Sequence, residues 1–352
     1  MNNSQTAIGR FVVKGVFVIS VLLTTFACKN MEHMKTTILA VCFCLFSGMA
    51  MSACSAHTHK VNGKEDKETV LHIPATLKDS LQAIADASHT EVGIALLTDG
   101  GDTLLVNNED KYPLMSVFKL HQAIALAHEL ESKGVSLDTL VHISAGELNP
   151  DTWSPMMKER GASGFDITVR ELLRYTLTLS DNNASNYMFR HLLDVGKTDA
   201  YIARLVPRNS FRLSFTEEEM WGDHKKCYAN HSSPLGVAML LNILYEASIM
   251  GKENQEFICR TLRECNTGQD RIVASLTGEK GLTVGHKTGS GFRDGGMLSA
   301  QNDAAYITLP DGRHYTLVVL VKDFKGTEDR ASAIIARISA VVYSALTEQS
   351  VD

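Results

Sequence analysis

Apolar and polar residues follow two different periods along this chain, and each period predicts a different kind of element. Runs typical of strands lie near the two ends, separated from their neighbours by turn residues, at residues 91–98, 103–106, 282–287, 303–309 and 314–321. From residue 116 to about residue 265 the apolar spacing is helical almost throughout. Two more helices are predicted at about residues 76–87 and 327–347. We therefore expect one sheet built from both ends of the chain, with a helical insertion between them.

This order of elements predicts an α/β (α+β) fold, in which an antiparallel sheet is flanked by helices beside an all-α subdomain. The α/β part would take about residues 73–110 and 266–352, and the all-α part about residues 111–265. With 352 residues, of which 44% are hydrophobic, the chain can bury a sizeable core. A binding or catalytic site is expected in a cleft between the two parts.

Two apolar runs precede the predicted domain, at residues 11–27 and 38–51. Neither is a clean transmembrane span of ~20 apolar residues. The second run has the length of a signal-peptide core, with Lys35 before it and small residues after it. Residues 1–54 are therefore expected to be a leader, and the protein is expected to be exported to the periplasm.

The end of the leader admits two interpretations. Residues 51–54 resemble a lipobox, in which Cys54 would carry a lipid anchor to the membrane. An ordinary signal-peptidase cut nearby is the alternative. Residues 55–72 are polar and predict a flexible tether, so His57 and His59 are expected to be solvated linker residues rather than a metal site.

Charge and cysteine content narrow the chemistry. Residues 1–54 carry a net charge of +3 and the whole chain carries −6, so the remainder carries −9, which argues against nucleic-acid binding. Outside the leader there is an odd number of cysteines without metal-ligand spacing, namely Cys227, Cys259 and Cys265. We expect no disulfide framework, no metal and no cofactor.

The run from residue 116 to residue 130 is apolar nearly all round, which predicts a buried helix. Ser116 and Lys119 are three residues apart at its start and would share a face. A buried lysine loses hydration and can take a proton from a hydroxyl, so the pair suits a serine nucleophile. The alternative is that Ser116 caps the helix while Lys119 reaches outward to solvent.

Two later motifs could serve the same site. Ser180, Asp181 and Asn182 follow a helix that opens with a capping box at Thr168. Such residues commonly form turns and caps, yet an exposed hydroxyl and carboxamide could also relay a proton and hold a substrate amide. At the end of the strand at 282–287, Lys287, Thr288, Gly289 and Ser290 could bind a carboxylate close to the backbone. A turn with a solvated lysine is the alternative there.

Taken together, Ser-x-x-Lys, then Ser-Asp-Asn, then Lys-Thr-Gly form a specific combination. The sequence resembles the class A serine β-lactamases over about residues 73–345, and it is most similar to the cephalosporinases of Bacteroides-like bacteria and their extended-spectrum relatives. The resemblance implies hydrolysis of β-lactam antibiotics through an acyl-enzyme. It also implies binding of mechanism-based inhibitors and a monomer.

The resemblance also implies a role for each motif. Ser116 would be the acylated nucleophile and Lys119 would help to deprotonate it. Ser180 and Lys287 would pass a proton to the β-lactam nitrogen and anchor the substrate carboxylate. The backbone N–H groups of Ser116 and Ser290 would form the oxyanion hole. The remaining substrate contacts would come from Asn182, Thr288, Gly289, Ser290 and Trp153, with a core tryptophan as the alternative for Trp153.

Deacylation requires a general base that holds a water molecule, and Glu217 is the candidate. Its neighbours Thr216 and Glu219 also fit a capping box, which is the structural alternative, and Glu218 is the second choice. The sequence departs from the family pattern at Trp221, where the usual residue is an asparagine that helps to hold the water.

Two further positions bear on substrate binding. Phe215 and Asn230 stand where an Arg–Asp ion pair often ties the loop that carries the base, so we expect a differently folded loop and a roomier cleft. Arg271 resembles an arginine that binds the substrate carboxylate in some members of the family, with Arg293 as a rival and a surface ion pair as the plain alternative.

Two other functions share the serine and lysine motifs. A penicillin-binding D,D-peptidase would stay acylated by β-lactams, because it lacks an effective deacylating base. A non-catalytic β-lactam receptor domain would be acylated once and used as a signal. Turnover supported by Glu217 would exclude both of these functions.

Overall fold

The computed structural model describes residues 70–109 and 111–348. The expected leader, Cys54 and the histidines of the tether lie outside the described residues. Within the described ranges, no helix combines the length and the apolar character that crossing a membrane requires.

An antiparallel sheet built from both ends of the described chain forms the centre of the fold, as predicted. Its strands are β1 (Glu91–Thr98), β2 (Thr103–Val106), β8 (Thr283–Ser290), β10 (Met297–Thr308) and β11 (His314–Lys325). They lie in the order β2-β1-β11-β10-β8, and the short β9 (Arg293–Asp294) also pairs with β10. The hairpin between β1 and β2 is confirmed, with Ile94 opposite Val106. Because β1 pairs with β11, the two ends of the described chain are joined in one sheet.

The strand β10 begins six residues earlier than predicted. Its first half is rich in polar residues, which hid the strand pattern, yet Gln301, Asn302 and Asp303 are all buried. The amides of two of them have protein partners: Gln301 Nε2 donates to Ser332 Oγ over 2.9 Å and Asn302 Nδ2 donates to the carbonyl of Pro113 over 2.7 Å. The amide nitrogens of Gln301 and Asn302 are thus satisfied in the core of a central strand, whereas their amide oxygens have no protein partner among the described residues.

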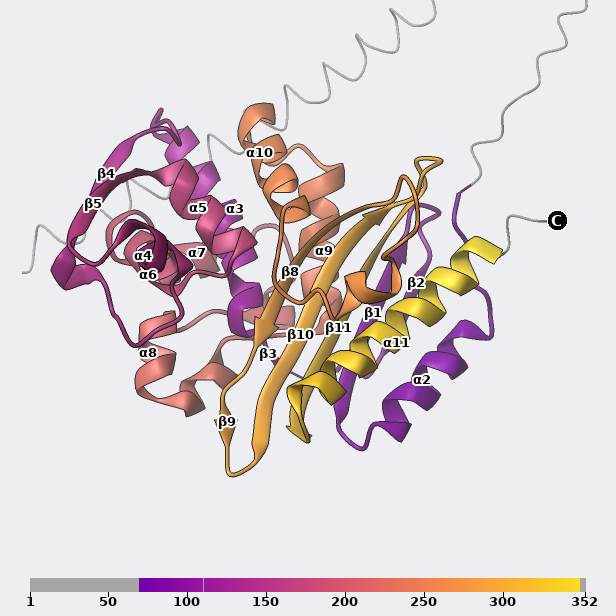
Figure 1. The fold of residues 1–352 in the computed structure, drawn as a ribbon. Coiled ribbons are helices and arrows are strands. Elements are labelled where there is room, and N and C mark those ends of the chain that lie inside the picture. The colour runs from indigo at the N-terminus through magenta and orange to yellow at the C-terminus, as the bar shows by residue number, and fades with distance from the viewer. Residues whose placement is uncertain (1–69, 110, 349–352) are drawn as a thin grey trace, which may run out of the picture. The chain divides into compact units, whose positions relative to one another are not determined.

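Helices cover both faces of this sheet (Figure 1). The helices α2 (Leu77–Ala87) and α11 (Glu328–Thr347) lie along one face. The helix α9 (Pro234–Glu246) packs against the other face, over β1, β10 and β11. The alternation along β1 explains this, since Ile94 joins the cluster of α2 and α11 while the adjacent Ala95 joins the cluster of α9.

The second part of the fold is mainly helical and also holds two small sheets. Its helices are α3 (Phe118–Ser132), α4 (Pro155–Arg160), α5 (Val169–Thr178), α6 (Asn182–His191), α7 (Val195–Ile202), α8 (Glu217–Gly222) and α10 (Lys252–Arg263). Its strands are β3 (Tyr112–Pro113), β4 (Leu140–Ser144), β5 (Gly164–Thr168), β6 (Phe211–Arg212) and β7 (His231–Ser232). They form a β3-β7-β6 sheet and a β4-β5 pair, and the all-helical description of this part omitted them.

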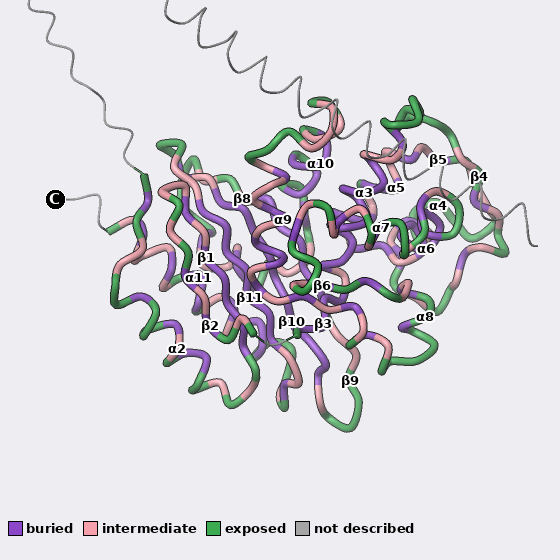
Figure 2. The backbone as a smooth tube through the Cα atoms, turned by 180° about the vertical axis from the view of Figure 1, so that it is seen from behind, coloured by how far each residue is buried: buried purple, intermediate pink, exposed green. Residues whose placement is uncertain are grey.

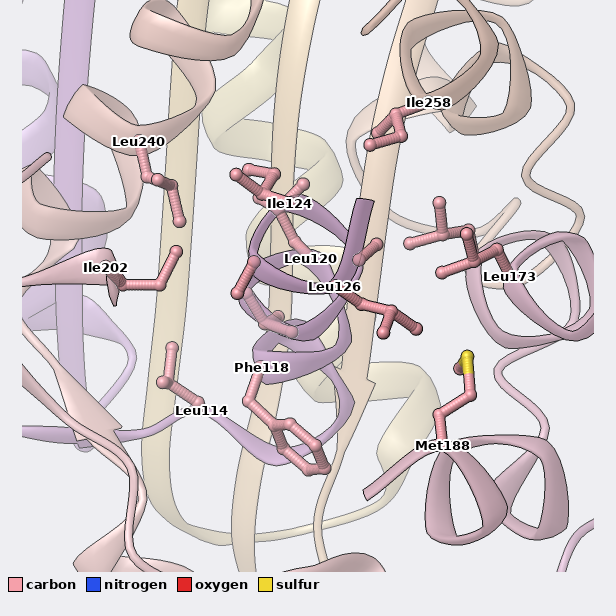
Figure 3. Close-up of a cluster of buried hydrophobic side chains, with 14 of the residues drawn as sticks. Leu114, Phe118, Leu120, Ile124, Leu126, Leu173, Met188, Ile202, Leu240 and Ile258 are labelled. Atoms are coloured by element: carbon pink, nitrogen blue, oxygen red, sulfur yellow. The ribbon is translucent and has the colours of Figure 1, made fainter. Parts of the chain in front are cut away.

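The helix α3 runs through the centre of this second part, as its apolar sequence predicts. Leu120, Ile124 and Leu126 point to different sides of the helix and meet side chains from several surrounding elements, among them Leu173 and Met188 (Figure 3). Burial follows the same logic through the molecule, since α3 and the middle strands of the large sheet are buried while helix outer faces are exposed (Figure 2). A rigid, buried α3 fixes whatever lies at its N-terminus.

Candidate active site

Ser116 lies in a single 3₁₀ turn, Met115–Val117, that leads directly into α3. The preceding Met115 has a φ of +45°, a conformation that costs a non-glycine residue about 1–3 kcal/mol. Asn302 Nδ2 holds this segment by donating to the carbonyls of Pro113 and Leu114 over 2.7 and 3.2 Å. The strained turn is therefore fixed from β10, and it presents the Ser116 hydroxyl at the edge of the core.

Lys119 is fully buried, so the alternative of a solvated lysine is wrong. Its Nζ donates to Ser116 Oγ over 3.0 Å, to the carbonyl of Ser180 over 2.8 Å and to Asn182 Oδ1 over 2.6 Å. It also forms an ion pair with Glu217 Oε1 at 2.8 Å. One ammonium group thus joins the three segments that carry Ser116, Ser180 and Glu217.

Glu217 opens the short helix α8 and is only 5% exposed. Ser116 Oγ donates to Glu217 Oε1 over 2.9 Å. The capping box of Thr216 and Glu219 is present as well, so the structural and the functional interpretations hold for different residues of one turn. Glu218, the second choice, faces away and pairs with Arg190 over 3.0 Å.

Ser180 follows α5 in a left-handed conformation, with a φ of +57°. The buried Asp181 fixes this turn by accepting from the backbone N–H groups of Met156 and Ala184 over 2.7 and 2.9 Å and from Ser154 Oγ. Burial raises the pKa of Asp181, although these hydrogen bonds oppose the shift. Asp181 is the cap of α6, and it directs Ser180 and Asn182 toward Lys119.

Lys287 lies on β8 and is fully buried on the opposite side of Ser180. Its Nζ donates to Ser180 Oγ over 3.0 Å and to the carbonyl of Thr288 over 2.9 Å. Burial, together with the positive charge of Lys119, lowers the pKa of Lys287 to about 7. The alternative of a turn with a solvated lysine is wrong.

The end of β8 offers its backbone to a ligand. Gly291 N–H donates to the carbonyl of Ala300 on β10, so in an antiparallel ladder the N–H of the adjacent Ser290 points away from β10 to the free edge. Gly289 lies against the Ser116 turn, and a Cβ there would come within 2.5 Å of the carbonyl oxygen of Leu114. Only glycine permits this approach, which brings the Ser290 and Ser116 backbones together.

Arg271 and Arg293 have different surroundings. Arg271 is 6% exposed, and its guanidinium donates to the carbonyls of Gly289 and Asn302 and to Ser290 Oγ over 3.1, 2.7 and 2.6 Å. Arg293 is exposed and donates to the carbonyl of Gly296 in its own turn. Arg271 therefore supports the end of β8 from below, and Arg293 belongs to the β9 turn.

Trp153 is 61% exposed, so the alternative of a core tryptophan is wrong. Its indole donates to the carbonyl of Leu179, and its own carbonyl accepts from the N–H of Asn182 over 2.9 Å. Asn182 Nδ2 donates to Thr152 Oγ1 over 2.9 Å. The Trp153 segment is thus tied to the Ser180 turn, with the ring free to contact a ligand.

The segment around Glu217 is held by Asn230 in place of an ion pair. Asn230 Oδ1 accepts from the N–H groups of Ser214 and Phe215 over 2.7 and 3.0 Å, and its Nδ2 donates to the carbonyl of Phe215 over 2.7 Å. Trp221 packs near Phe292, with ring centroids 6.1 Å apart, in the turn after β8. An indole in this position holds the loop against the β8 side and cannot replace the amide of an asparagine.

Three buried amides or carboxylates, Asn302, Asp181 and Asn230, fix backbone turns of the site. Asn302 was not singled out from the sequence, whereas Asp181 stood inside a motif and Asn230 was noted only as a departure from an ion pair. Their common signal is a polar residue inside an apolar run, which single-sequence patterns also produce at loops. Among the described residues, no group of three or more His, Cys, Asp and Glu side chains could hold a metal ion. Cys227, Cys259 and Cys265 are free thiols.

Comparisons with known proteins agree with this geometry. The model of the beta-lactamase enzyme family matches residues 76–346. A beta-lactamase of Phocaeicola vulgatus is 52% identical over 276 residues, which are 78% of this chain and 86% of that protein. The extended-spectrum beta-lactamase PER-1 of Pseudomonas aeruginosa is 30% identical over 268 residues, which are 76% of this chain and 86% of that protein.

The solved structures point the same way. A class A beta-lactamase from Bacteroides cellulosilyticus DSM 14838 superposes with a TM-score of 0.73 at 30% identity, over 78% of this chain and 98% of that one. Both parts of the fold, the sheet and the helical part, are included in a match of this extent.

Proposed function

Because this chain belongs to the class A beta-lactamases and hydrolyses β-lactam antibiotics, we propose that the residues gathered around Ser116 carry out that reaction and so confer resistance. The observation that carries the proposal is the position of Ser116 Oγ, which lies within hydrogen-bond distance of both Lys119 Nζ and Glu217 Oε1. A serine held between a cation and a carboxylate is an activated nucleophile.

In the acylation step, Ser116 Oγ attacks the carbonyl carbon of the β-lactam ring. Its proton passes first to Glu217, to which the hydroxyl already donates over 2.9 Å. Lys119 Nζ donates to Ser116 Oγ, to the carbonyl of Ser180 and to Asn182 Oδ1, and it forms an ion pair with Glu217. It therefore holds Ser116 and Glu217 in position for this transfer. Direct proton uptake by Lys119 is the alternative route.

The opposite wall of the site would bind the substrate carboxylate and protonate the leaving nitrogen. Ser180 Oγ would donate to the β-lactam nitrogen and receive a proton from Lys287, whose Nζ is 3.0 Å away. Thr288 and Ser290 would bind the carboxylate, with Arg271 holding Ser290 in place. The N–H groups of Ser116 and Ser290 would stabilise the oxyanion, which is commonly the largest single catalytic contribution.

Deacylation would use Glu217 a second time. Glu217 must first release the proton that it took from Ser116, and this proton would return through Lys119 and Ser180 Oγ, which are 3.5 Å apart, to Lys287, which gave one up during acylation. Because the esterified Ser116 no longer donates to Glu217, the regenerated carboxylate is then available to a water molecule next to the ester. A D,D-peptidase would lack such a group. The buried position of Glu217 beside Ser116 therefore favours turnover over a permanently acylated penicillin-binding or receptor protein.

Intact-mass spectrometry of the protein mixed with excess cephalosporin tests this proposal. The parent should return to its free mass as the drug is consumed. Glu217→Gln should remain acylated, with a deacylation rate lower by roughly a hundredfold or more, because the general base is gone. Glu218→Gln is the matched control and should behave as the parent does, since Glu218 faces Arg190.

If the parent itself stays trapped with one adduct per chain, the peptidase or receptor alternative is right. Export to the periplasm, either lipidated at Cys54 or soluble, is part of the same proposal, because β-lactams reach their targets outside the cytoplasm. The exposed Trp153 and the loop tied by Asn230 support cephalosporins with large side chains as substrates. A monomer and sensitivity to mechanism-based inhibitors are expected on the same basis.

A further inference from the structure

A buried cluster of ionisable groups lies behind β8, and the hydrolytic steps above do not use it. His286 is adjacent to Lys287 in the strand but points to the other face, where its Nδ1 contacts Asp303 Oδ1 over 3.0 Å. Both residues are almost completely buried. The other ring nitrogen, Nε2, has no conventional hydrogen-bond partner among the described residues. The His286 side chain also interacts with the thiol of Cys265, which follows the C-terminal end of α10.

The order Asp303–His286–Cys265 is that of an activated thiol. The carboxylate of Asp303 and the sulfur of Cys265 outweigh burial and raise the pKa of His286 to about 10. The imidazolium, with help from Lys287, in turn outweighs burial and lowers the pKa of Cys265 to about 7. Arg271 is the other cation near this sulfur. At this pKa about half of the Cys265 thiol is ionised at pH 7, and the thiolate is the nucleophilic form.

A cavity gives this thiol an approach from solvent. Cys265, which is 7% exposed, lines a cavity of about 620 Å³ between α5 and the end of α10. The mouth carries both signs of charge, with Arg174 paired to Glu264 over 3.0 Å. Cys227 and Cys259 do not line it. Of the three described cysteines, Cys265 is the one that lines this cavity.

A chain of hydroxyl groups connects this thiol to the substrate-binding strand. Cys265 Sγ is 3.4 Å from Thr267 Oγ1, which is 2.5 Å from Thr288 Oγ1. Thr288 is one of the residues assigned above to the substrate carboxylate. A group attached to the sulfur would displace Thr267 and remove the partner that orients the Thr288 hydroxyl.

We propose that Cys265 is a modification site for low-molecular-weight disulfides and that its modification lowers hydrolysis through Thr267 and Thr288. The Cys265 thiolate attacks one sulfur of R–S–S–R and forms a new Cys265–S–S–R bond. The R–S–S–R bond breaks, and R–S⁻ leaves with the electron pair. Cys265 is oxidised and the reagent is reduced by the same two electrons, and a thiol reverses the exchange. The effect on hydrolysis rests on the proposed function, whereas the thiol chemistry does not.

The full chain treated with hydroxyethyl disulfide at pH 7 tests the proposal, with adducts located by peptide mass mapping. Cys265 should be modified at least about tenfold faster than Cys259, because burial raises the pKa of Cys259 to about 11 and leaves little thiolate. Hydrolysis should fall about tenfold as the adduct forms and return after dithiothreitol. An unmodified Cys265 in the native protein, or an adduct without loss of hydrolysis, would overturn the proposal.

Three variants separate the steps. Cys265→Ser should hydrolyse the drug and be insensitive to the disulfide, with Cys259→Ser as the matched control that stays sensitive. His286→Asn should shift the pH profile of Cys265 modification upward by about one unit, toward an ordinary thiol, which a merely structural role would not do. Thr267→Ala should be modified somewhat more slowly than the parent, because the Thr267 hydroxyl helps to lower the pKa of Cys265, but it should lose less hydrolysis on modification. If the parent forms the adduct but never hydrolyses the drug, the proposed function fails and the thiol site stands.

Discussion

The two walls of the candidate site each contain one fully buried lysine, and the two lysines have opposite electrostatic surroundings. On the helical wall, Lys119 has a carboxylate partner, Glu217, at 2.8 Å. On the strand wall, Lys287 has no carboxylate within ion-pair distance among the described residues and donates only to the hydroxyl of Ser180 and the carbonyl of Thr288. Burial lowers the pKa of Lys287 to about 7, and the more distant negative charges of Cys265 and Glu217 offset this only in part.

The difference shows what each wall is built to do. On the helical wall, the charge of Lys119 is balanced by Glu217 before substrate binds. This wall is therefore prearranged for proton transfer. On the strand wall, Lys287 has no paired carboxylate among the described residues, so an anionic ligand would supply the missing negative charge. Substrate binding would raise the pKa of Lys287 again, because an opposite charge favours the ammonium form. The free enzyme thus holds one wall ready for chemistry and the other ready for a carboxylate.

Lys119→Met acts on the helical wall and should have the largest effect. Glu217 would be left buried without its cation, which costs about 3–5 kcal/mol of unfolding free energy in comparable buried pairs. Hydrolysis should fall by roughly 10³-fold or more, since Ser116 loses one of its two hydrogen-bond partners and the cation beside Glu217 is gone. Urea unfolding and steady-state hydrolysis at pH 7 measure the two effects.

The double variant Lys119→Met with Glu217→Gln is the control for this prediction. It removes both charges, so much of the lost stability should return while hydrolysis stays low. A double variant as unstable as Lys119→Met alone would show that packing, and not the unpaired carboxylate, caused the loss.

Lys287→Met acts on the strand wall, and its effect should depend on pH. Below about pH 7 Lys287 is protonated in both the folded and the unfolded state. The folded protein then bears the whole free-energy cost of burying the charged ammonium group. Between about pH 7 and pH 10 the unfolded chain binds more protons, because a free lysine has a pKa of about 10.4, so the parent gains unfolding free energy as pH rises. Relative to the variant this gain should be roughly 2–4 kcal/mol.

Urea unfolding of parent and variant at pH 7 and pH 9.5 measures that difference, and groups common to both proteins cancel. Hydrolysis by Lys287→Met should fall by roughly a hundredfold, through KM because the carboxylate partner is lost and through kcat because Ser180 loses its proton source. A pH-independent stability difference between parent and variant would contradict the depressed pKa.

Much of this comparison could be predicted from the sequence, because the three motifs are local. Ser116 and Lys119 are on one turn, and the motif at Lys287 ends a recognisable strand. The pairing of Glu217 with Lys119 could not be predicted with the same certainty, because Glu217 lies about a hundred residues from Ser116 in the chain. Glu217 was reached through resemblance, against a capping box that the structure also contains.

The residues that were missed share a physical cause. Ser299, Gln301 and Asn302 interrupt the apolar pattern at the start of β10, so the strand was predicted to begin at Asp303, six residues too late. The partners of Asn302 and Asp303, which are Pro113 and His286, come from distant segments, and no local period predicts such contacts. Asn230 replaces an ion pair by binding backbone groups, a substitution that the residue type alone does not specify. Local periodicity thus located the elements, and long-range polar contacts decided the details.

Ser180 connects the two walls, and its backbone and side chain can be tested separately. Its carbonyl accepts from Lys119 and its Oγ accepts from Lys287. Ser180→Ala and Ser180→Gly both remove the hydroxyl, so each should lower hydrolysis by about a hundredfold. Since the φ of Ser180 is +57°, the glycine variant should be more stable than the alanine variant by about 1 kcal/mol.

Thermal or urea unfolding of the two variants measures the stability difference, and cephalosporin hydrolysis measures the activity. Equal stabilities would mean that the left-handed turn is not strained. Nearly full activity in either variant would mean that Lys287 or solvent protonates the leaving nitrogen without Ser180.

The smallest expected effect concerns the support of the strand wall. Arg271→Lys keeps the charge but loses the planar guanidinium that donates to Gly289, Asn302 and Ser290 together. The end of β8 should then hold Ser290 less firmly, and kcat/KM for an anionic cephalosporin should fall about tenfold, mainly through KM. Arg293→Lys is the matched control and should change kcat/KM by less than about twofold, because Arg293 is exposed and donates only within its own turn. Equal losses of kcat/KM in the two variants would mean that the specific contacts of Arg271 with β8 do not matter for substrate binding. A loss confined to Arg271→Lys would mean that substrate binding depends on the guanidinium contacts that hold the end of β8. This is the outcome expected if the strand wall binds the substrate carboxylate while the helical wall is prearranged for proton transfer.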